Sequence, residues 1–159
     1  MSARVGIGFD AHRLAAGRKL VLGGVEIPHD RGLEGHSDGD VLLHALSDAL
    51  LGAIAAPDLG SLFPSAGEEW RGASSVRFVE EALTRVRGQG FRVENVDLVI
   101  VAEEPRLAPH AERIRARVAE ILGVPVSSVG LKSKTTDGLG FTGRKEGIAA
   151  HAVALLSPL

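Results

Sequence analysis

The sequence predicts an α/β fold, an α+β sandwich in which helices pack on one face of a single mixed β-sheet. Segments of alternating, β-rich composition interleave with segments whose apolar residues recur at helical spacing, in the order hairpin, helix, helix, strand, helix, strand. The 159 residues contain no internal repeat and no low-complexity linker. We therefore expect a single domain over residues 1–159, large enough to bury a core of its own.

Composition narrows the classes of function. The chain has no cysteine, which excludes disulfides and thiolate metal sites and leaves histidine and carboxylate as the strong metal ligands. Its net charge of -2 gives no basic field for nucleic acid. No apolar run is as long as a membrane span, and the N-terminus lacks the charged and then apolar segments of a signal peptide. A cytoplasmic protein is expected.

The first predicted strand covers residues 4–10. Asp10 and His12 are two residues apart, so a backbone that stays extended would point both side chains the same way. Gly6 and Gly8 begin a G-x-G-x-x-A pattern typical of dinucleotide-binding turns, but that pattern needs a helix directly after the glycines, and none is predicted here. The glycines are expected instead to allow close approach of another backbone segment.

A hairpin follows, with strands at residues 19–22 and 25–27 joined by Gly23-Gly24. Residues 29–32 are polar and are predicted to form a solvated turn.

The central predicted helix starts within the stretch His36-Ser37-Asp38-Gly39-Asp40-Val41-Leu42-Leu43-His44 and extends to about Ile54. Ser37 or Asp38 is expected to cap it, with Asp40 as the acid of a capping box.

Asp40, His44 and Asp48 are spaced by four residues and would share one helix face. On the helix pattern alone, His44 is either a hydrogen-bonded core histidine or a ligand, and the first is the commoner case.

The second half of the chain supplies the other elements. Residues 57–60 end the central helix, and residues 63–72 are predicted to form a mobile surface loop. The remaining predicted elements are a helix from Ser74-Ser75 to Gly88, a strand at 91–101, a helix from about Pro109 to Gly123, and strands at 129–133 and 148–156.

Asp10, His12 and His44 together have the ligand count of a catalytic zinc site that keeps one position open for water or substrate. The alternative is that two are surface residues and the third is a core histidine. Spacing alone does not decide whether the three side chains meet.

The loop at residues 132–144 concentrates glycines, hydroxyls and cations, which suit a polyphosphate because backbone N–H groups, threonine hydroxyls and lysine or arginine all donate to anionic oxygens. It lacks the G-x-x-x-x-G-K-[ST] pattern of a P-loop. A tight glycine loop between two strands is an equal alternative.

Several motifs resemble one enzyme family. They are Gly8-Phe9-Asp10-Ala11-His12, residues 36–46 with 48–53, Asp58-Leu59-Gly60 with Phe63-Pro64, and residues 139–149. In this order, over nearly the whole chain, they resemble the 2-C-methyl-D-erythritol 2,4-cyclodiphosphate synthases of the non-mevalonate isoprenoid pathway. The resemblance favours the zinc interpretation of the Asp-His-His set.

The resemblance implies a homotrimer of α/β subunits with active sites at the subunit interfaces. It implies the substrate 4-diphosphocytidyl-2-C-methyl-D-erythritol 2-phosphate, and as products the cyclic diphosphate and CMP. The implied cofactors are Zn²⁺ or another divalent transition metal at Asp10, His12 and His44, and Mg²⁺ or Mn²⁺ with the substrate diphosphate near Asp137.

The resemblance also assigns site residues. His36 and Thr135 match residues that stabilise the transition state. The positions that match substrate contacts are Asp10, His12, His36, Ser37, Asp58, Leu59, Gly60, Phe63, Ala102, Pro105, Arg106, Leu107, Ala108, Ser133, Lys134, Thr135, Thr136, Asp137, Phe141 and Arg144. Of these, residues 102–108 and 133–136 match segments that hold cytidine and its phosphates from a neighbouring subunit.

The chain departs from the family pattern at three places. Lys134 stands where a small or hydroxyl residue is usual, Asp137 stands where glutamate is usual, and Ser65-Ala66-Gly67 lacks the acids of some relatives. Arg144 matches a residue near the trimer axis, where the family has been thought to admit isoprenoid diphosphates to a central cavity.

Two other functions remain open at this stage. A metal-dependent phosphohydrolase would share the zinc site, and a trimeric isoprenoid-diphosphate binding protein would use Arg144 without catalysis. The products formed from the cytidyl substrate distinguish them.

Overall fold

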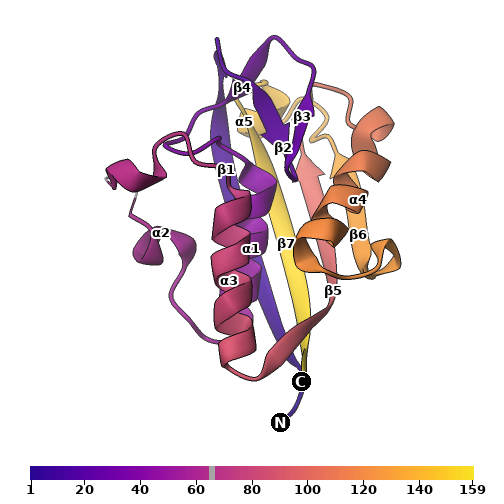
Figure 1. Cartoon of the computed structure of the whole chain (residues 1–159). Helices are drawn as coiled ribbons and strands as arrows, with labels where there is room; N and C mark the ends of the chain where they lie inside the picture. Colours follow the sequence, from indigo (N-terminus) through magenta and orange to yellow (C-terminus); the bar gives the residue numbers. More distant parts are fainter. Residues whose placement is uncertain (65–66) are drawn as a thin grey trace.

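A computed structural model describes residues 1–64 and 67–159. It contains a five-stranded sheet in the order β4-β1-β7-β5-β6 and a separate two-stranded sheet of β2 and β3 (Figure 1). The strands are β1 (Arg4–Ala16), β2 (Leu20–Leu22), β3 (Val25–Ile27), β4 (Arg31–Leu33), β5 (Phe91–Val101), β6 (Val129–Lys134) and β7 (Gly147–Pro158). The helices are α1 (Val41–Ala53), α2 (Leu59–Leu62), α3 (Val76–Gly88), α4 (Ala111–Leu122) and α5 (Gly140–Gly143), with single 3-10 turns at Glu68–Trp70, Ala108–His110 and Val126–Ser128.

The large sheet is mixed, as predicted. Strands β5 and β6 are parallel, while β7 is antiparallel to both β1 and β5. The C-terminal strand, whose period was ambiguous in the sequence, is thus the centre of the sheet, and its prediction as a strand is confirmed.

Helices cover one face of the sheet and leave the other open. Along β7 the side chains of Ile148, Ala150, Ala152, Ala154 and Leu156 are fully buried, whereas the alternate residues face outward. Figure 1 shows α1, α3 and α4 on the covered side. The open face carries the exposed apolar side chains of Val5, Ile7, Phe9, Val153 and Leu155.

Two glycines bring α1 against β1. A Cβ added to Gly6 would lie 1.9 Å from the carbonyl oxygen of Ala49, and one added to Gly8 would lie 1.8 Å from that of Ala45. No other residue would permit this approach. The expected role of the glycines is confirmed, and because β1 continues as a strand, so is the rejection of a dinucleotide-binding turn.

The start of α1 differs from the prediction. Asp40, rather than Ser37 or Asp38, is the N-cap, and its carboxylate accepts from the backbone N–H of Leu43 at 3.0 Å. The same carboxylate accepts from Gly23 N–H at 3.0 Å and Gly24 N–H at 2.7 Å. Asp40 therefore ties the hairpin turn to the helix. Its fully buried carboxylate is bonded to that turn, so it does not share the surface on which His44 and Asp48 lie.

Two further expectations were wrong. The polar segment at 29–32 contributes to strand β4, which pairs with the end of β1 through Leu14, Ala15 and Ala16. Strand β1 accordingly extends to Ala16 and does not stop at Asp10. Backbone pairing with a long partner strand overrode the low β-propensity of this segment.

The loop after α1 is partly ordered by aromatic packing. Trp70, expected on the loop surface, is half-buried, with its ring centroid 5.1 Å from that of Phe78 and 4.9 Å from that of Phe63. These contacts hold the turn Glu68–Trp70 against α3. Ser65 and Ala66 lie outside the described residues. The missing acids in Ser65-Ala66-Gly67, one of the three departures from the family pattern, therefore fall mostly on residues that are not described.

The predicted elements from residue 74 onward are confirmed within one or two residues, including the α3 helix after Ser75 and the left-handed Gly123 that ends α4. Within the described residues, no helix combines the length and apolar character that crossing a bilayer requires.

Candidate metal centre and binding cavity

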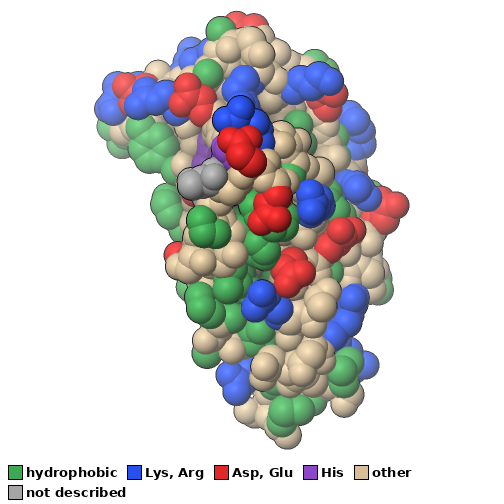
Figure 2. Space-filling view, turned by 60° about the vertical axis from the view of Figure 1, so that its left-hand side comes forward, with side chains coloured by type: hydrophobic (Ala, Val, Ile, Leu, Met, Phe, Trp, Pro, Cys, Tyr) green, Lys and Arg blue, Asp and Glu red, His purple; other side chains and the backbone are tan. Residues whose placement is uncertain are grey.

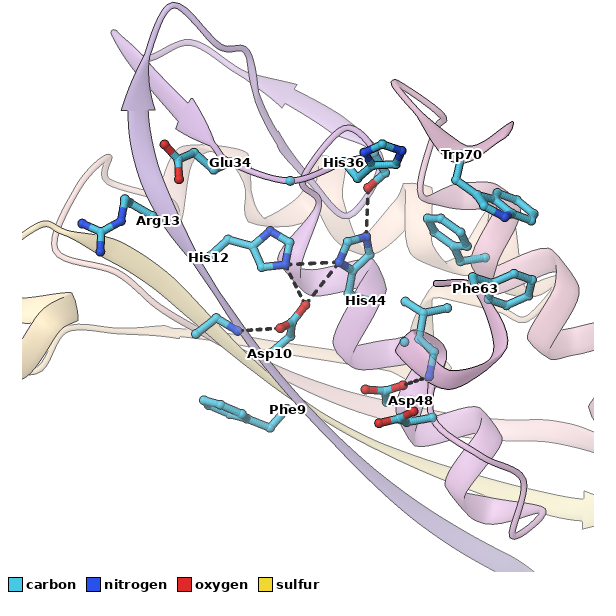
Figure 3. A pocket seen from close by; sticks show the side chains of 17 residues that line it. Phe9, Asp10, His12, Arg13, Glu34, His36, His44, Asp48, Phe63 and Trp70 are labelled. Carbon is cyan, nitrogen blue, oxygen red and sulfur yellow. Dashed lines mark hydrogen bonds and ion pairs between the residues drawn. The ribbon is translucent and has the colours of Figure 1, made fainter. Parts of the chain in front are cut away.

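Three side chains from two elements converge beside α1. Asp10 and His12 project from β1 toward the helix, on the same side as Gly6 and Gly8, and His44 projects from the first turn of α1 (Figure 3). His12 Nε2 lies 2.8 Å from Asp10 Oδ2, and His44 Nδ1 lies 3.2 Å from the same oxygen. The two ring nitrogens are 3.3 Å apart. The three residues that the sequence singled out therefore meet.

These separations fit a tetrahedral metal. With metal–ligand distances of about 2.0–2.1 Å, the edges of a coordination tetrahedron are about 3.3 Å long. The distances between Asp10 Oδ2, His12 Nε2 and His44 Nδ1 are 2.8, 3.2 and 3.3 Å. One ion placed above this triangle would be held by all three atoms.

The far side of the His44 ring is held by a relay of hydrogen bonds. Nε2 of His44 lies 2.9 Å from Ser75 Oγ, and the Ser75 hydroxyl donates to the Asp38 carboxylate. Because that hydroxyl donates onward, its oxygen accepts from Nε2–H. This tautomer leaves the lone pair on Nδ1, the atom that faces Asp10 and His12, as metal ligation requires.

The electrostatics of the cluster favour an ionised carboxylate between two imidazoles. Burial raises the pKa of Asp10, but its hydrogen bonds to His12 and His44 and their charge outweigh burial and hold the pKa well below its usual range. Burial lowers the pKa of His12, but the bond to Asp10, its charge and the backbone of Glu34 outweigh burial and raise that pKa. The carboxylate is thus ready to bind a cation without losing a proton first.

The cluster lies in the wall of a cavity of about 820 Å³. Figure 2 shows histidine surface recessed in a hollow, with hydrophobic side chains beside it. The lining residues are Phe9, Asp10, Ala11, His12, Arg13, Glu34, Gly35, His36, Ser37, His44, Asp48, Asp58, Leu59, Gly60, Phe63, Trp70 and Phe78. In Figure 3, His12 and His44 face each other across the cluster, whereas Phe9 points away on the other side of β1.

A second acidic position faces the same cavity from α1. Asp48 accepts from the backbone N–H of Leu59 at 2.7 Å and so fixes the start of α2 against α1. Burial raises the pKa of Asp48, and the hydrogen bond from Leu59 partly offsets this rise. Asp58 caps α2 by accepting from Ser61 N–H at 2.9 Å.

Nine of the predicted site residues gather in this cavity, namely Asp10, His12, His36, Ser37, His44, Asp58, Leu59, Gly60 and Phe63. They come from β1, the segment before α1, α1 itself and the turn into α2. One cavity therefore contains the candidate metal ligands and the positions matched to the erythritol and its phosphate.

The other predicted residues lie outside that cavity. Ala102, Pro105, Arg106, Leu107 and Ala108 follow β5, and Ser133, Lys134, Thr135, Thr136, Asp137, Phe141 and Arg144 lie at the end of β6 and around α5. Because β5 and β6 are parallel, both segments leave the sheet at the same end. In the sheet order, β7 lies between β1 and β5, so the segments that follow β5 and β6 are separated from the metal cluster by β7. Phe141 of α5 is nearer, since it lines a small separate cavity together with His12.

Hydrogen bonds join the second group into one surface. Ala102 N–H donates to the carbonyl of Lys134 at 2.9 Å, and Gly138 N–H donates to Glu103 at 2.9 Å. Asp137, with a left-handed φ of 51°, is exposed and pairs with the Thr135 hydroxyl at 3.3 Å. The segment between β6 and β7 contains only the short helix α5, so the interpretation as a tight glycine loop is correct for the shape of this segment. Whether it binds a polyphosphate is part of the proposal below.

Sequence reasoning missed the residues that support the cluster. Ser75 was expected only to begin a helix, and Asp38 only to cap one, yet both hold His44. Phe78 and Trp70 close the cavity wall from α3 and its preceding turn. Nothing in local spacing links position 75 to position 44, because the contact exists only once α1 and α3 pack together.

Comparisons with known proteins agree over the whole chain. A model of the YgbB family matches residues 3–157. The 2-C-methyl-D-erythritol 2,4-cyclodiphosphate synthase of Marinobacter nauticus is 54% identical over 153 residues, covering 96% of this chain and 96% of the relative. A solved 2C-methyl-D-erythritol-2,4-cyclodiphosphate synthase in a CDP-bound form has a TM-score of 0.90 at 39% identity, covering 97% of this chain and 100% of its own. The bifunctional IspDF of Campylobacter jejuni has a TM-score of 0.95 at 37% identity, covering 99% of this chain, which corresponds to 42% of that longer one.

Proposed function

This chain belongs to the YgbB family, and on that premise we propose that it is a cyclodiphosphate synthase of the non-mevalonate isoprenoid pathway. It converts 4-diphosphocytidyl-2-C-methyl-D-erythritol 2-phosphate to 2-C-methyl-D-erythritol 2,4-cyclodiphosphate and CMP. The observation that carries the proposal is the triangle of Asp10, His12 and His44 in the wall of a cavity of about 820 Å³. One catalytic domain over residues 1–159 is part of the same proposal.

The triangle suits a divalent transition metal, and zinc is the ion we propose. Its donors are two imidazoles and a carboxylate, and the chain has no thiolate to compete for the ion. A dication held there supplies Lewis-acid withdrawal of charge from a phosphate group. Ser75 and Asp38 hold the ring of His44 with Nδ1 toward Asp10 and His12, where the ion would be held.

The reaction needs positioning rather than a protein nucleophile. An oxygen of the substrate's own 2-phosphate attacks the β-phosphorus, and the bond from that phosphorus to the oxygen bridging to the α-phosphorus breaks, so CMP leaves with the bridging oxygen. The attack is intramolecular and gains its rate from a bent substrate. His36 and Ser37, with residues 58–60 opposite, line the cavity where the erythritol and its 2-phosphate would be held.

We further propose that the second group of residues binds the cytidine diphosphate part. The segment 102–108 and residues 133–137 carry backbone N–H groups, hydroxyls and Lys134, which suit phosphate oxygens. Asp137 is the carboxylate proposed to hold magnesium or manganese with the diphosphate. Its exposed position on a loop rich in donors supports this role.

The homotrimer that the resemblance implies is part of the proposal, and the separation of the two groups of residues supports it. Among the described residues, the lining of the cavity at the metal cluster includes none of the cytidine segments, so a neighbouring copy is proposed to supply the second half of each site. The open sheet face, with exposed apolar residues Val5, Ile7 and Phe9, is the surface proposed to be buried in that assembly. In that trimer we place Arg144 at the central cavity and propose that an isoprenoid diphosphate binds there.

The test is incubation of the metal-loaded protein with the cytidyl substrate and identification of the products by ³¹P NMR. We expect the cyclic diphosphate and an equal amount of CMP, and we expect a His44→Ala variant to form neither. Release of an open-chain phosphate would make the protein a phosphohydrolase. Absence of turnover, with unchanged binding of isoprenoid diphosphate to His44→Ala, would make it a binding protein.

A further inference from the structure

A second cavity lies on the other side of the segment that carries His36. It measures about 530 Å³ and is lined by Arg18, Lys19, Val21, Gly35, His36, Ser37, Asp38, Arg71 and Gly72. Gly35, His36 and Ser37 also line the cavity of the Asp10-His12-His44 cluster. One short segment of backbone is therefore a wall of both cavities.

The charges around the second cavity are mainly positive. Arg18, Lys19 and Arg71 line it, and the carboxylate of Asp38 is the opposing charge. That carboxylate already accepts from Asp40 N–H and Ser75 N–H, each at 3.0 Å, and from the Ser75 hydroxyl. These bonds of the carboxylate go to groups other than Arg18, Lys19 and Arg71, and three cations against one carboxylate leave the lining with an excess of positive charge.

Arg18 is anchored in a way that leaves a donor free. One guanidinium nitrogen donates to the Ser37 carbonyl at 3.1 Å, whereas Nε is buried and has no hydrogen-bond partner among the described residues. A buried donor without an acceptor costs free energy, which a ligand oxygen would recover. A phosphate group matches this need because it accepts several hydrogen bonds from guanidinium groups.

Arg71 and Lys19 complete the lining from the solvent side. Arg71 pairs with Glu68 at 3.4 Å, but both side chains are largely exposed, at 69% and 76%, so the pair contributes little and is free to rearrange. Lys19 is exposed as well. Both cations can therefore turn toward an anion without breaking a buried contact.

We propose that this cavity is a second anion site, which takes a phosphate or diphosphate group and by doing so sets the position of residues 35–37. Arg18 donates a hydrogen bond to the Ser37 carbonyl, so an anion that moves the Arg18 guanidinium also moves this carbonyl. Gly72 N–H, from the same cavity wall, donates to the His36 carbonyl at 2.8 Å, which is a second connection to the segment. Anion binding is thereby coupled to the placement of the His36 ring in the neighbouring cavity.

The coupling between anion binding and the position of His36 goes beyond the proposed function. The anion binding itself does not depend on that function. A protein without synthase activity would still bind the anion, so turnover and binding fail separately. Coupling to His36 has a consequence for catalysis only if His36 acts as proposed above.

Calorimetric titration with inorganic diphosphate tests the site. The parent, loaded with metal, is expected to bind diphosphate at two classes of site, one in each cavity. The double variant Lys19→Gln with Arg71→Gln is expected to lose one class or weaken it by about tenfold or more, because two charge-assisted hydrogen bonds are removed. Both residues are exposed, so thermal unfolding should confirm that the variant folds normally.

The matched control is Arg85→Gln with Arg113→Gln, which removes the same charge from α3 and α4, outside both cavities. It should keep both classes of site. Equal titrations of the parent and the Lys19 and Arg71 double variant would overturn the proposal.

A second measurement tests the coupling. Diphosphate is expected to shift the backbone amide NMR resonances of His36 and Ser37. The diphosphate concentration that gives half of this shift should equal the half-saturating concentration of the class of site that the double variant loses. Shifts of the same size and midpoint in the double variant would show that the anion reaches this segment only through the cavity of the Asp10-His12-His44 cluster, and the coupling would be wrong.

Discussion

Ser75 Oγ lies 2.9 Å from Nε2 of His44 and at the same time donates to Asp38, so one serine from α3 fixes both the tautomer and the ring orientation of a histidine on α1. Partners of this kind commonly change metal affinity by about 10–100-fold when they are removed. Ser75→Ala is accordingly expected to weaken zinc binding to the metal-stripped protein by about that factor, measured by competition with a chromogenic chelator.

Ser74→Ala is the matched control for this change. Ser74 is exposed, and its hydroxyl accepts a long hydrogen bond of 3.3 Å from Val76 N–H. Its zinc affinity should equal that of the parent. A Ser75→Ala protein that binds zinc as tightly as Ser74→Ala would contradict the relay through His44.

Gly8→Ala tests the close contact between β1 and α1. The added Cβ would lie 1.8 Å from the Ala45 carbonyl oxygen, and backbone atoms on both sides leave it no room. Overpacking of this kind costs roughly 1–3 kcal/mol or more of the free energy of unfolding. Because His44 lies one residue from Ala45, zinc affinity should fall as well.

Gly88→Ala serves as the control for the added methyl group. A Cβ at Gly88, at the end of α3, meets nothing within 4 Å. The substitution should leave the free energy of unfolding unchanged or raise it by up to about 1 kcal/mol, since alanine is the better helix former. Urea unfolding of both variants makes the comparison, and similar midpoints for the two would argue against the backbone contact.

Asp40→Asn tests the buried carboxylate that joins the hairpin to α1. Asparagine keeps an acceptor for Leu43 N–H, but its amide would oppose one of the N–H groups of Gly23 and Gly24. Leaving such a donor unpaired should lower the free energy of unfolding by roughly 1–3 kcal/mol. Asp30→Asn, at a side chain that is 85% exposed, is the control and should unfold as the parent does.

The same variant has an expected pH dependence. Burial raises the pKa of Asp40 to about 6, while its backbone hydrogen bonds act in the opposite direction. A carboxyl whose pKa is raised on folding stabilises the folded state most below its unfolded pKa, and this contribution is lost as the pH rises through the folded value. The difference in stability between parent and Asp40→Asn should therefore narrow between pH 4 and pH 7, and a difference that widens would contradict the raised pKa.

The sequence predicted the elements well because most of them are local patterns. The alternation in β5, the helical stripe of α3 and the Gly23-Gly24 turn each depend on neighbours within the same segment. The metal ligands were also predictable as a set, since Asp10 and His12 share a strand face by period and His44 opens a helix. Their convergence was not predictable from spacing, because it depends on the contact of Gly6 and Gly8 with α1.

What the sequence missed depends on contacts between distant segments. Residues 31–33 form a strand because β1 offers a partner edge, and their own composition gave no sign of it. Asp40 became the cap because the hairpin turn presents two N–H groups to it. Ser75 reaches His44 only across the α1 and α3 contact.

The separation of the metal cluster from the cytidine segments gives the strongest test of a shared active site. If each site combines the metal half of one subunit with residues 133–137 of another, two different inactive chains can complement each other. We expect His44→Ala and Thr135→Ala each to have little activity alone. After mixing and reassembly from denaturant in equal amounts, about a quarter of the sites should contain two intact halves, because each half is intact with a probability of one half.

Mixing His44→Ala with Asp10→Ala is the control, since both changes affect the same half and no combination of subunits restores it. Turnover of the cytidyl substrate to the cyclic diphosphate is the measurement for both mixtures. Recovery in the first mixture and none in the second would support composite sites. The first mixture could instead stay inactive while the refolded parent regains its activity. That result would mean that each chain carries a complete site, in which residues 133–137 reach the metal cluster of their own chain.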